Sequence, residues 1–202
     1  MTAKKALHDD IDRMFEYGIY LPTRTIYMGS TSQDYEGNES GVDSTMAERS
    51  IKALHIMDRS APDRDKPITV IMNNPGGDYY HGMAIFDAIQ ACQNRVTIKA
   101  TGYAMSMGSI ILQAADERVL TPNARVMIHY GTSGFNDHAK NMKRWSDEYE
   151  KLHEWVELLY LGKIRELHPL FTLVQVKEMC NFDTILSAKE AIDLGLADRI
   201  EY

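Results

Sequence analysis

The sequence predicts an α/β fold, in which a parallel sheet is built from strands that alternate with helices. Short apolar runs rich in valine and isoleucine indicate buried strands, and the segments between them repeat apolar residues at helical spacing. The predicted strands are residues 24–28, 67–74, 96–102 and 125–131. Because strands that are separated by helices pair in parallel, this alternation is typical of an α/β domain. The 202 residues suit a single domain, 1–202, that is long enough to bury a core.

The N-terminal third is predicted to hold two helices with a strand and a loop between them. The apolar residues on one face of the first helix are Leu7, Ile11, Met14 and Phe15. After the strand at 24–28, the stretch 31–44 is polar, acidic and glycine-bearing, so it predicts a surface loop. A second helix is expected near 45–58, and the linker SAPDRDK follows it.

Further helices are expected between the later strands and in the C-terminal tail. Apolar spacing predicts helices at 80–92 and 107–115. In the tail, Ser187 and Glu190 have the spacing of a capping box, which satisfies free N–H groups where a helix begins. Gly195 is predicted to stop that helix before a last strand.

Residues 137–167 predict a long helix with one narrow apolar stripe among charged residues. The stripe consists of Trp145, Tyr149, Leu152, Val156 and Leu159. A helix of this length overhangs a domain of this size, so two interpretations of the stripe are open. It packs on its own domain, or it mates with another subunit.

Composition and charge predict a soluble, cytoplasmic protein. A formal net charge of −7 argues against nucleic acid or an anionic membrane as the main partner. No apolar run reaches membrane-spanning length, and the polar start MTAKKALHDD does not resemble a signal peptide. The two cysteines, Cys92 and Cys180, favour a reducing compartment, although a single disulfide stays open. No histidines have zinc-ligand spacing, so neither a metal nor another cofactor is expected.

The segment GYAMSMGS, residues 102–109, places a serine where a strand ends and a helix begins. Ser106 is therefore either a helix N-cap or a nucleophile presented at the mouth of the helix. The octapeptide alone favours the N-cap. The catalytic interpretation needs a base for the serine proton, and the helix N-terminus would offer N–H groups to a developing oxyanion.

Three other segments are candidates for the remaining parts of such a site. His129 ends the apolar strand RVMIH, at the carboxyl edge where α/β sheets place ligands. The glycines of NNPGG, residues 73–77, let backbone N–H groups face a substrate. Asp183 precedes the capped helix of the tail. Each of these signals by itself is also compatible with a purely structural role.

Taken together, these segments resemble the Clp protease proteolytic subunit (ClpP) family of serine peptidases. The likeness covers roughly residues 20–202. The segments that carry it are NNPGG, HGMAIFDAIQ, GYAMSMGS, LTPNARVMIH and NFDTILSAKEAIDLGLAD. The resemblance implies a crotonase-like spiral of β-β-α units, with 137–167 as a protruding handle helix that joins two rings.

The resemblance also implies the roles of individual residues. Ser106 would be the nucleophile, His129 the general base and then acid, and Asp183 the group that orients the imidazole. The oxyanion hole would be the N–H groups of Gly77 and Met107. The substrate would lie as an added strand along Gly131, Thr132, Ser133 and Gly134, which gives main-chain recognition with low sequence specificity.

Members of the family form heptameric rings stacked in pairs, with the active sites facing an inner chamber. The resemblance therefore implies a homo-oligomer, with peptides or unfolded proteins as substrates and an AAA+ unfoldase as a possible partner. The chain departs from the family at its short N-terminal segment and its long acidic loop, and CNFDT offers only Asp183 where charged neighbours are usual. The positions that match the unfoldase-docking groove are mostly polar or small: Thr69, Ile71, Ala91, Lys99 and Thr101.

Two alternatives to an ordinary ClpP-type peptidase follow from these departures. One is a specialised relative with the same chemistry, such as a maturation peptidase for a viral shell. The other is a non-catalytic ring subunit, against which the complete Ser-His-Asp set speaks.

Overall fold

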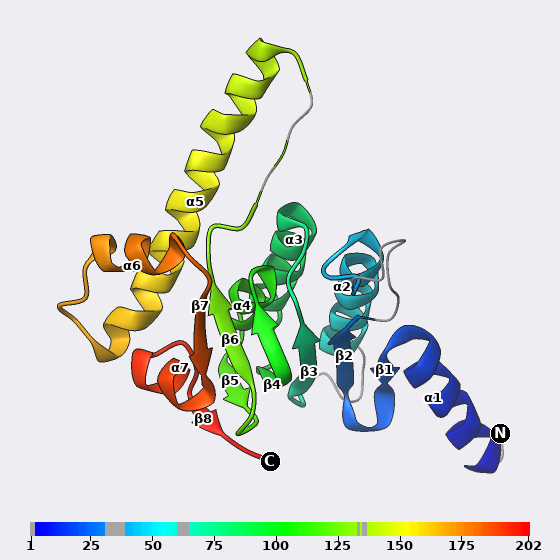
Figure 1. The fold of residues 1–202 in the computed structure, drawn as a ribbon. Coiled ribbons are helices and arrows are strands. Elements are labelled where there is room, and N and C mark those ends of the chain that lie inside the picture. The colour runs from blue at the N-terminus through cyan, green and yellow to red at the C-terminus, as the bar shows by residue number, and fades with distance from the viewer. Residues whose placement is uncertain (1–2, 31–38, 60–64, 133, 135–136) are drawn as a thin grey trace.

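In the computed structural model, which describes residues 3–30, 39–59, 65–132, 134 and 137–202, strands and helices form a mixed α/β fold (Figure 1). Within these residues, eight strands form one sheet. The strands are β1 (Ile19–Tyr20), β2 (Thr25–Gly29), β3 (Ile68–Asn74), β4 (Val96–Met105), β5 (Glu117–Leu120), β6 (Arg125–Ile128), β7 (Thr184–Ser187) and β8 (Arg199–Ile200). The predicted α/β class is confirmed, and β2, β3, β4 and β6 are the four predicted strands.

The sheet is parallel through its centre and antiparallel at two places. The order β2-β3-β4-β5-β8 is parallel throughout. The long strand β4 pairs first with β5 and then, through Tyr103–Met105, with β6. The four predicted strands pair in parallel, as expected. Two further strands that were not predicted pair antiparallel, β1 with β2 and β7 with β6. Since β6 pairs with β4 on one side and β7 on the other, the ends of these three strands lie together.

Seven helices lie within the described residues, and the apolar face predicted for the first of them is largely exposed, at Leu7, Ile11 and Phe15. The helices are α1 (Ala3–Tyr17), α2 (Ser44–Arg59), α3 (Tyr79–Gln90), α4 (Met107–Leu112), α5 (Ala139–Leu167), α6 (Leu173–Cys180) and α7 (Ala188–Leu194), with a 3-10 turn, η1, at Leu21–Thr23. Neighbouring helices α2 and α3, and α3 and α4, pack on one another. The core between helices and sheet includes the fully buried Val70, Met72, Ile98 and Ile111.

The predicted boundaries of the C-terminal helix are confirmed. Ser187 Oγ accepts a hydrogen bond from the Glu190 N–H, and the Glu190 side chain accepts from the Ser187 N–H. Gly195 ends the helix in the left-handed conformation, at φ 87°, and β8 follows. Helix α6, in contrast, was not predicted. It begins with its own capping box, formed by Thr172 and Gln175.

Helix α5 is 29 residues long and projects from the rest of the fold (Figure 1). Its C-terminal half packs on its own chain, where the buried residues are Val156, Glu157, Tyr160, Leu161 and Ile164. Its N-terminal half is open, and the Trp145 side chain is 40% exposed. The stripe is buried at Val156 and exposed at Trp145, so packing on its own domain accounts only for the C-terminal half of the stripe.

Two of the predicted segments lie wholly or partly outside the described residues. These are the acidic loop, through residues 31–38, and the linker after α2, through residues 60–64. Both cysteines are free thiols, with Cys92 half-buried and Cys180 buried. In the part of the chain that the structure describes, no helix combines the length and the apolar character needed to cross a membrane.

Candidate active site

Ser106 occupies the sharp junction between β4 and α4. Its backbone has φ 52° and ψ −123°, a conformation that residues with a side chain seldom adopt. The Ser106 N–H donates to the Met127 carbonyl, which fixes the junction against β6. The predicted alternative, a serine that caps the helix, is wrong because the Ser106 side chain makes no capping hydrogen bond.

The Ser106 hydroxyl instead lies beside His129. A hydrogen bond of 2.8 Å joins Ser106 Oγ and His129 Nε2, and a second of 2.8 Å joins His129 Nδ1 and Asp183 Oδ1. An ionised carboxylate only accepts hydrogen bonds, so Nδ1 carries the ring proton of the neutral imidazole. Nε2 is then the acceptor for the serine hydroxyl. This is the arrangement in which an imidazole can remove a serine proton.

The pairing of β6 with β7 explains how residues 54 positions apart in the chain meet. His129 is the first residue after β6, and Asp183 is the residue before β7. The antiparallel register places Ile128 opposite Thr184, so the next pair outward is His129 and Asp183. Ser106 joins them because Met105, the last residue of β4, pairs with Met127 of β6. Three strand ends thus assemble the three side chains.

The two predicted oxyanion donors, Gly77 and Met107, line the same cavity as Ser106. Met107 is the first residue of α4, where a helix leaves its N–H groups without intrahelical acceptors. The segment after β3 is held by Val42, whose N–H donates to the Gly76 carbonyl and whose carbonyl accepts from the Asp78 N–H. Among the described residues, the intervening Gly77 N–H has no hydrogen-bond acceptor. Both N–H groups are thus available to a ligand.

A cavity of about 430 Å³ opens beside these groups. Gly77, Ser106, Met107 and His129 contribute to its wall, and its apolar side is formed by Ile110 of α4 with Leu152 and Val156 of α5. The cavity thus places an apolar wall beside the Ser106 hydroxyl.

The structure tests the predicted substrate-binding segment only in part. Gly131 and Thr132 line the cavity, whereas Gly134 is exposed and is not part of the lining. Ser133 lies outside the described residues. No residue from 131 to 134 that the structure describes belongs to a strand, and pairing of this segment with a substrate stays a prediction.

Two of the tyrosines that line the cavity, Tyr79 and Tyr130, have raised pKa values. Burial raises the pKa of Tyr79 to about 12. Burial, together with a hydrogen bond to Glu157, raises the pKa of Tyr130 well above its usual value. Both phenols therefore stay protonated at neutral pH. In the part of the chain that the structure describes, no cluster of three or more His, Cys, Asp or Glu residues is arranged to hold a metal ion.

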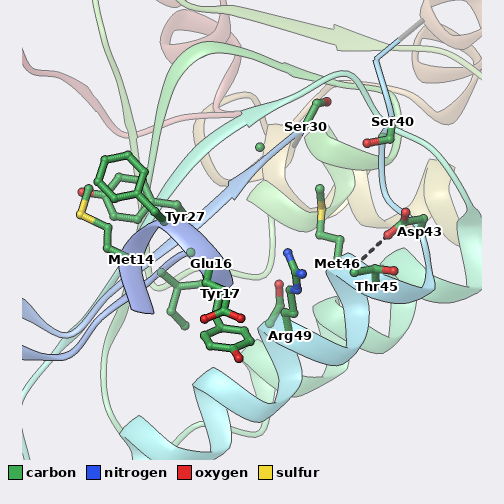
Figure 2. Close-up of a pocket in the computed structure, with 16 residues that line it drawn as sticks. Met14, Glu16, Tyr17, Tyr27, Ser30, Ser40, Asp43, Thr45, Met46 and Arg49 are labelled. Carbon is green, nitrogen blue, oxygen red and sulfur yellow. Dashed lines mark hydrogen bonds between the residues drawn. The ribbon is translucent and has the colours of Figure 1, made fainter. Parts of the chain in front are cut away.

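A second cavity, of about 520 Å³, lies between α1, β2 and α2 (Figure 2). Met14, Tyr27 and Arg49 belong to its lining, and Asp43 accepts a hydrogen bond from the Met46 N–H at its edge. It is the larger of the two, but none of the three residues of the Ser-His-Asp set lines it. The candidate active site is therefore the smaller cavity.

Comparison with known proteins gives matches over most of the chain. A family model described as Clp protease matches residues 38–201, which include all three residues of the Ser-His-Asp set. The chain is also similar to a protein of Deinococcus radiodurans named ATP-dependent Clp protease proteolytic subunit. The two are 31% identical over 191 residues, which cover 91% of this chain and 84% of that protein.

Proposed function

The chain belongs to the Clp protease family, and from this premise we propose that it is a serine endopeptidase that cleaves peptides and unfolded proteins inside an oligomeric chamber. The observation that carries the proposal is the pair of 2.8 Å hydrogen bonds that link Ser106 to His129 and His129 to Asp183. A serine is a weak nucleophile until a base takes its proton, and this geometry supplies the base and its orienting carboxylate.

In the proposed reaction, Ser106 Oγ attacks the scissile carbonyl while His129 Nε2 takes the hydroxyl proton. The carbonyl oxygen becomes negative and accepts hydrogen bonds from the N–H groups of Gly77 and Met107. When the tetrahedral intermediate collapses, His129 gives its proton to the leaving amine, and the acyl group stays on Ser106. Water then attacks the acyl-enzyme with His129 again as the base. Asp183 holds the imidazole in the required tautomer throughout.

Covalent labelling tests this proposal directly. A fluorophosphonate should modify the protein at Ser106, as located by mass spectrometry, because only an activated serine reacts quickly with this reagent. The same preparation should hydrolyse fluorogenic peptides and an unfolded protein without ATP. Absence of both labelling and hydrolysis in an assembled protein would instead favour the non-catalytic ring subunit. Labelling with cleavage of only one native client would favour the specialised maturation peptidase.

Oligomerisation is the second part of the proposal. The similar protein of Deinococcus radiodurans is named as a subunit, and the exposed half of α5 here needs a covering surface. We propose homo-oligomeric rings, heptameric and stacked in pairs, with α5 as the handle between two rings. The buried half of the helix packs on its own chain, so only the exposed half is assigned to this contact.

Trp145→Glu should therefore separate the stacked rings without unfolding the subunit. A charge placed in an apolar contact must be buried without a partner, and loss of one aromatic anchor typically weakens an interface by about 2 kcal/mol or more. The measurement is the mass in solution by light scattering, together with the circular dichroism spectrum. Ser146→Glu is the matched control, because it adds the same charge at the adjacent exposed position. A double ring that is equally stable in both variants contradicts the assignment.

The residues at the positions that match the docking groove for an AAA+ unfoldase do not favour docking of such a partner. Of the five positions that match the docking groove, only Ile71 has a large apolar side chain of the kind that anchors a partner loop. Thr69, Ala91, Lys99 and Thr101 are polar or small. Lys99 is already paired within the chain, because its Nζ donates to Glu201 Oε1 at 3.3 Å and to the Tyr202 carbonyl at 2.7 Å. An acidic docking loop would have to displace these contacts. We therefore propose cleavage that does not depend on a standard unfoldase.

A further inference from the structure

Tyr130, the residue that follows His129, is held at three points. Its N–H donates to the Cys180 carbonyl at 3.0 Å, and its hydroxyl donates to Glu157 Oε1 at 2.6 Å. Its ring packs against the His153 ring with 4.5 Å between centroids. Two of these partners lie on α5 and one ends α6, so the chain just past the imidazole is fastened to both helices.

Glu157 is an unusual residue to find at this place. It faces the core from the packed half of α5, with 4% of its surface exposed. Its carboxylate receives the Tyr130 hydroxyl on Oε1 and lies 3.4 Å from Lys177 Nζ on Oε2. Burying a carboxylate with its partners is often no more favourable than an apolar side chain of similar size. Stability alone therefore does not explain why a charged residue occupies this position.

The contacts of Tyr130 with Cys180 and Glu157, and of Glu157 with Lys177, connect the segment that carries His129 to the segment that carries Asp183. Tyr130 adjoins His129, and Lys177 lies on α6, which ends at Cys180, three residues before Asp183. The Asp183 side chain is 68% exposed, so little packing holds it beside the imidazole. Its position depends on the backbone around it, and the hydrogen bond from Tyr130 to Cys180 fixes the two backbones to each other.

We propose that Tyr130 and Glu157 are positioning residues, which keep His129 and Asp183 in register by tying the end of β6 to α5 and α6. The inference rests on the proposed serine-peptidase function and adds a part of the site that touches neither substrate nor reacting atoms. Displacement of a catalytic group by about 1 Å can lower the rate about 100-fold. The contact between Tyr130 and Glu157, called the tether below, lies one residue from the base, so its loss should lower kcat strongly.

Three variants test the tether. Tyr130→Phe removes only the hydroxyl, and Glu157→Leu removes the carboxylate. In the double variant Tyr130→Phe/Glu157→Leu both partners become apolar, which leaves no buried hydroxyl without an acceptor and should preserve the thermal midpoint. A positioning role predicts that kcat of the double variant falls about 10-fold or more, with KM within about twofold, because the chemistry and not the binding surface is disturbed. The fluorophosphonate labelling rate should fall in parallel.

Two further comparisons of kcat distinguish a positioning role from a general loss of stability. Glu157→Gln keeps an oxygen that accepts from Tyr130, so its kcat should lie between those of the wild type and Glu157→Leu. The double variant should lose no more kcat than the worse single variant, because the two side chains act as one tether. Glu178→Gln, an exposed carboxylate on α6, is the control that should leave kcat and assembly unchanged.

The outcomes separate this inference from the function on which it rests. If the wild type neither labels nor hydrolyses peptides, the proposed function fails. If the wild type is active and the double variant, folded and assembled, has the same kcat and labelling rate, the tether is overturned. A double variant that loses kcat only in proportion to a lower thermal midpoint also overturns it, because that is the signature of a merely structural contact.

Discussion

Ser106→Ala is expected to abolish peptide hydrolysis while leaving the fold and the oligomer intact. Loss of the nucleophile of a triad lowers kcat by about 10⁴–10⁶, because its members act as a unit. His129→Ala should give a loss of the same order, since the serine then has no base within reach. The measurement is the rate of cleavage of a fluorogenic peptide by each purified variant, with light scattering to confirm assembly.

The double variant Ser106→Ala/His129→Ala should be no less active than either single one. If Ser106→Ala protein cleaves peptides at the wild-type rate and contaminating peptidase is excluded, the nucleophile has been assigned to the wrong residue. Loss of activity accompanied by loss of the oligomer would point to a role in folding instead.

Gly76→Ala is expected to lower the rate of hydrolysis roughly 100-fold, although Gly76 contributes no side chain. A Cβ atom at this position would lie 2.5 Å from the Ser106 Cβ and 3.1 Å from its Oγ. Gly76 also has φ 108°, which a residue with a side chain rarely adopts. The serine must therefore move, and a shift of about 1 Å costs roughly 100-fold in rate. The strained backbone should cost about 1–3 kcal/mol of stability as well.

The control for this prediction is Gly162→Ala. Gly162 lies inside α5, no atom approaches its Cβ position within 4 Å, and alanine is the better helix former. The thermal midpoint of Gly162→Ala should be equal to or above that of the wild type, at full activity. A Gly76→Ala protein that retains full kcat would contradict this prediction, because it would mean that the segment after β3 can shift while Ser106 stays in place.

The sequence predicts the centre of the fold well because its strands are buried and their neighbours are helices. Strand β5 was missed because its run begins with Glu117 and Arg118, and these charges are acceptable only through distant partners. Arg118 pairs with Asp198, and Glu117 pairs with Arg199. Such partners lie about 80 residues away along the chain, where periodicity carries no information.

The candidate site, like the fold, has parts that local pattern predicts and parts that depend on distant contacts. Ser106 and His129 could be proposed from their strand ends, but the place of Asp183 depends on the antiparallel pairing of β6 with β7, which local pattern does not predict. Tyr130 and Glu157 were missed altogether. A glutamate on a helix is normally assigned to the solvent face, whereas the structure shows this one buried and in contact with the Tyr130 hydroxyl. A tyrosine immediately after the candidate base was the available signal.

The positive φ of Ser106 has a consequence for how this protein could evolve. A glycine would occupy the same backbone conformation without the steric cost, which for a residue with a side chain is about 1–3 kcal/mol. Selection for heat resistance alone would therefore favour the loss of the serine, and selection for hydrolysis would retain it. A lineage released from the need to cleave peptides would gain stability by the very substitution that ends catalysis. At the junction of β4 and α4, thermal stability therefore favours glycine and catalytic activity requires serine.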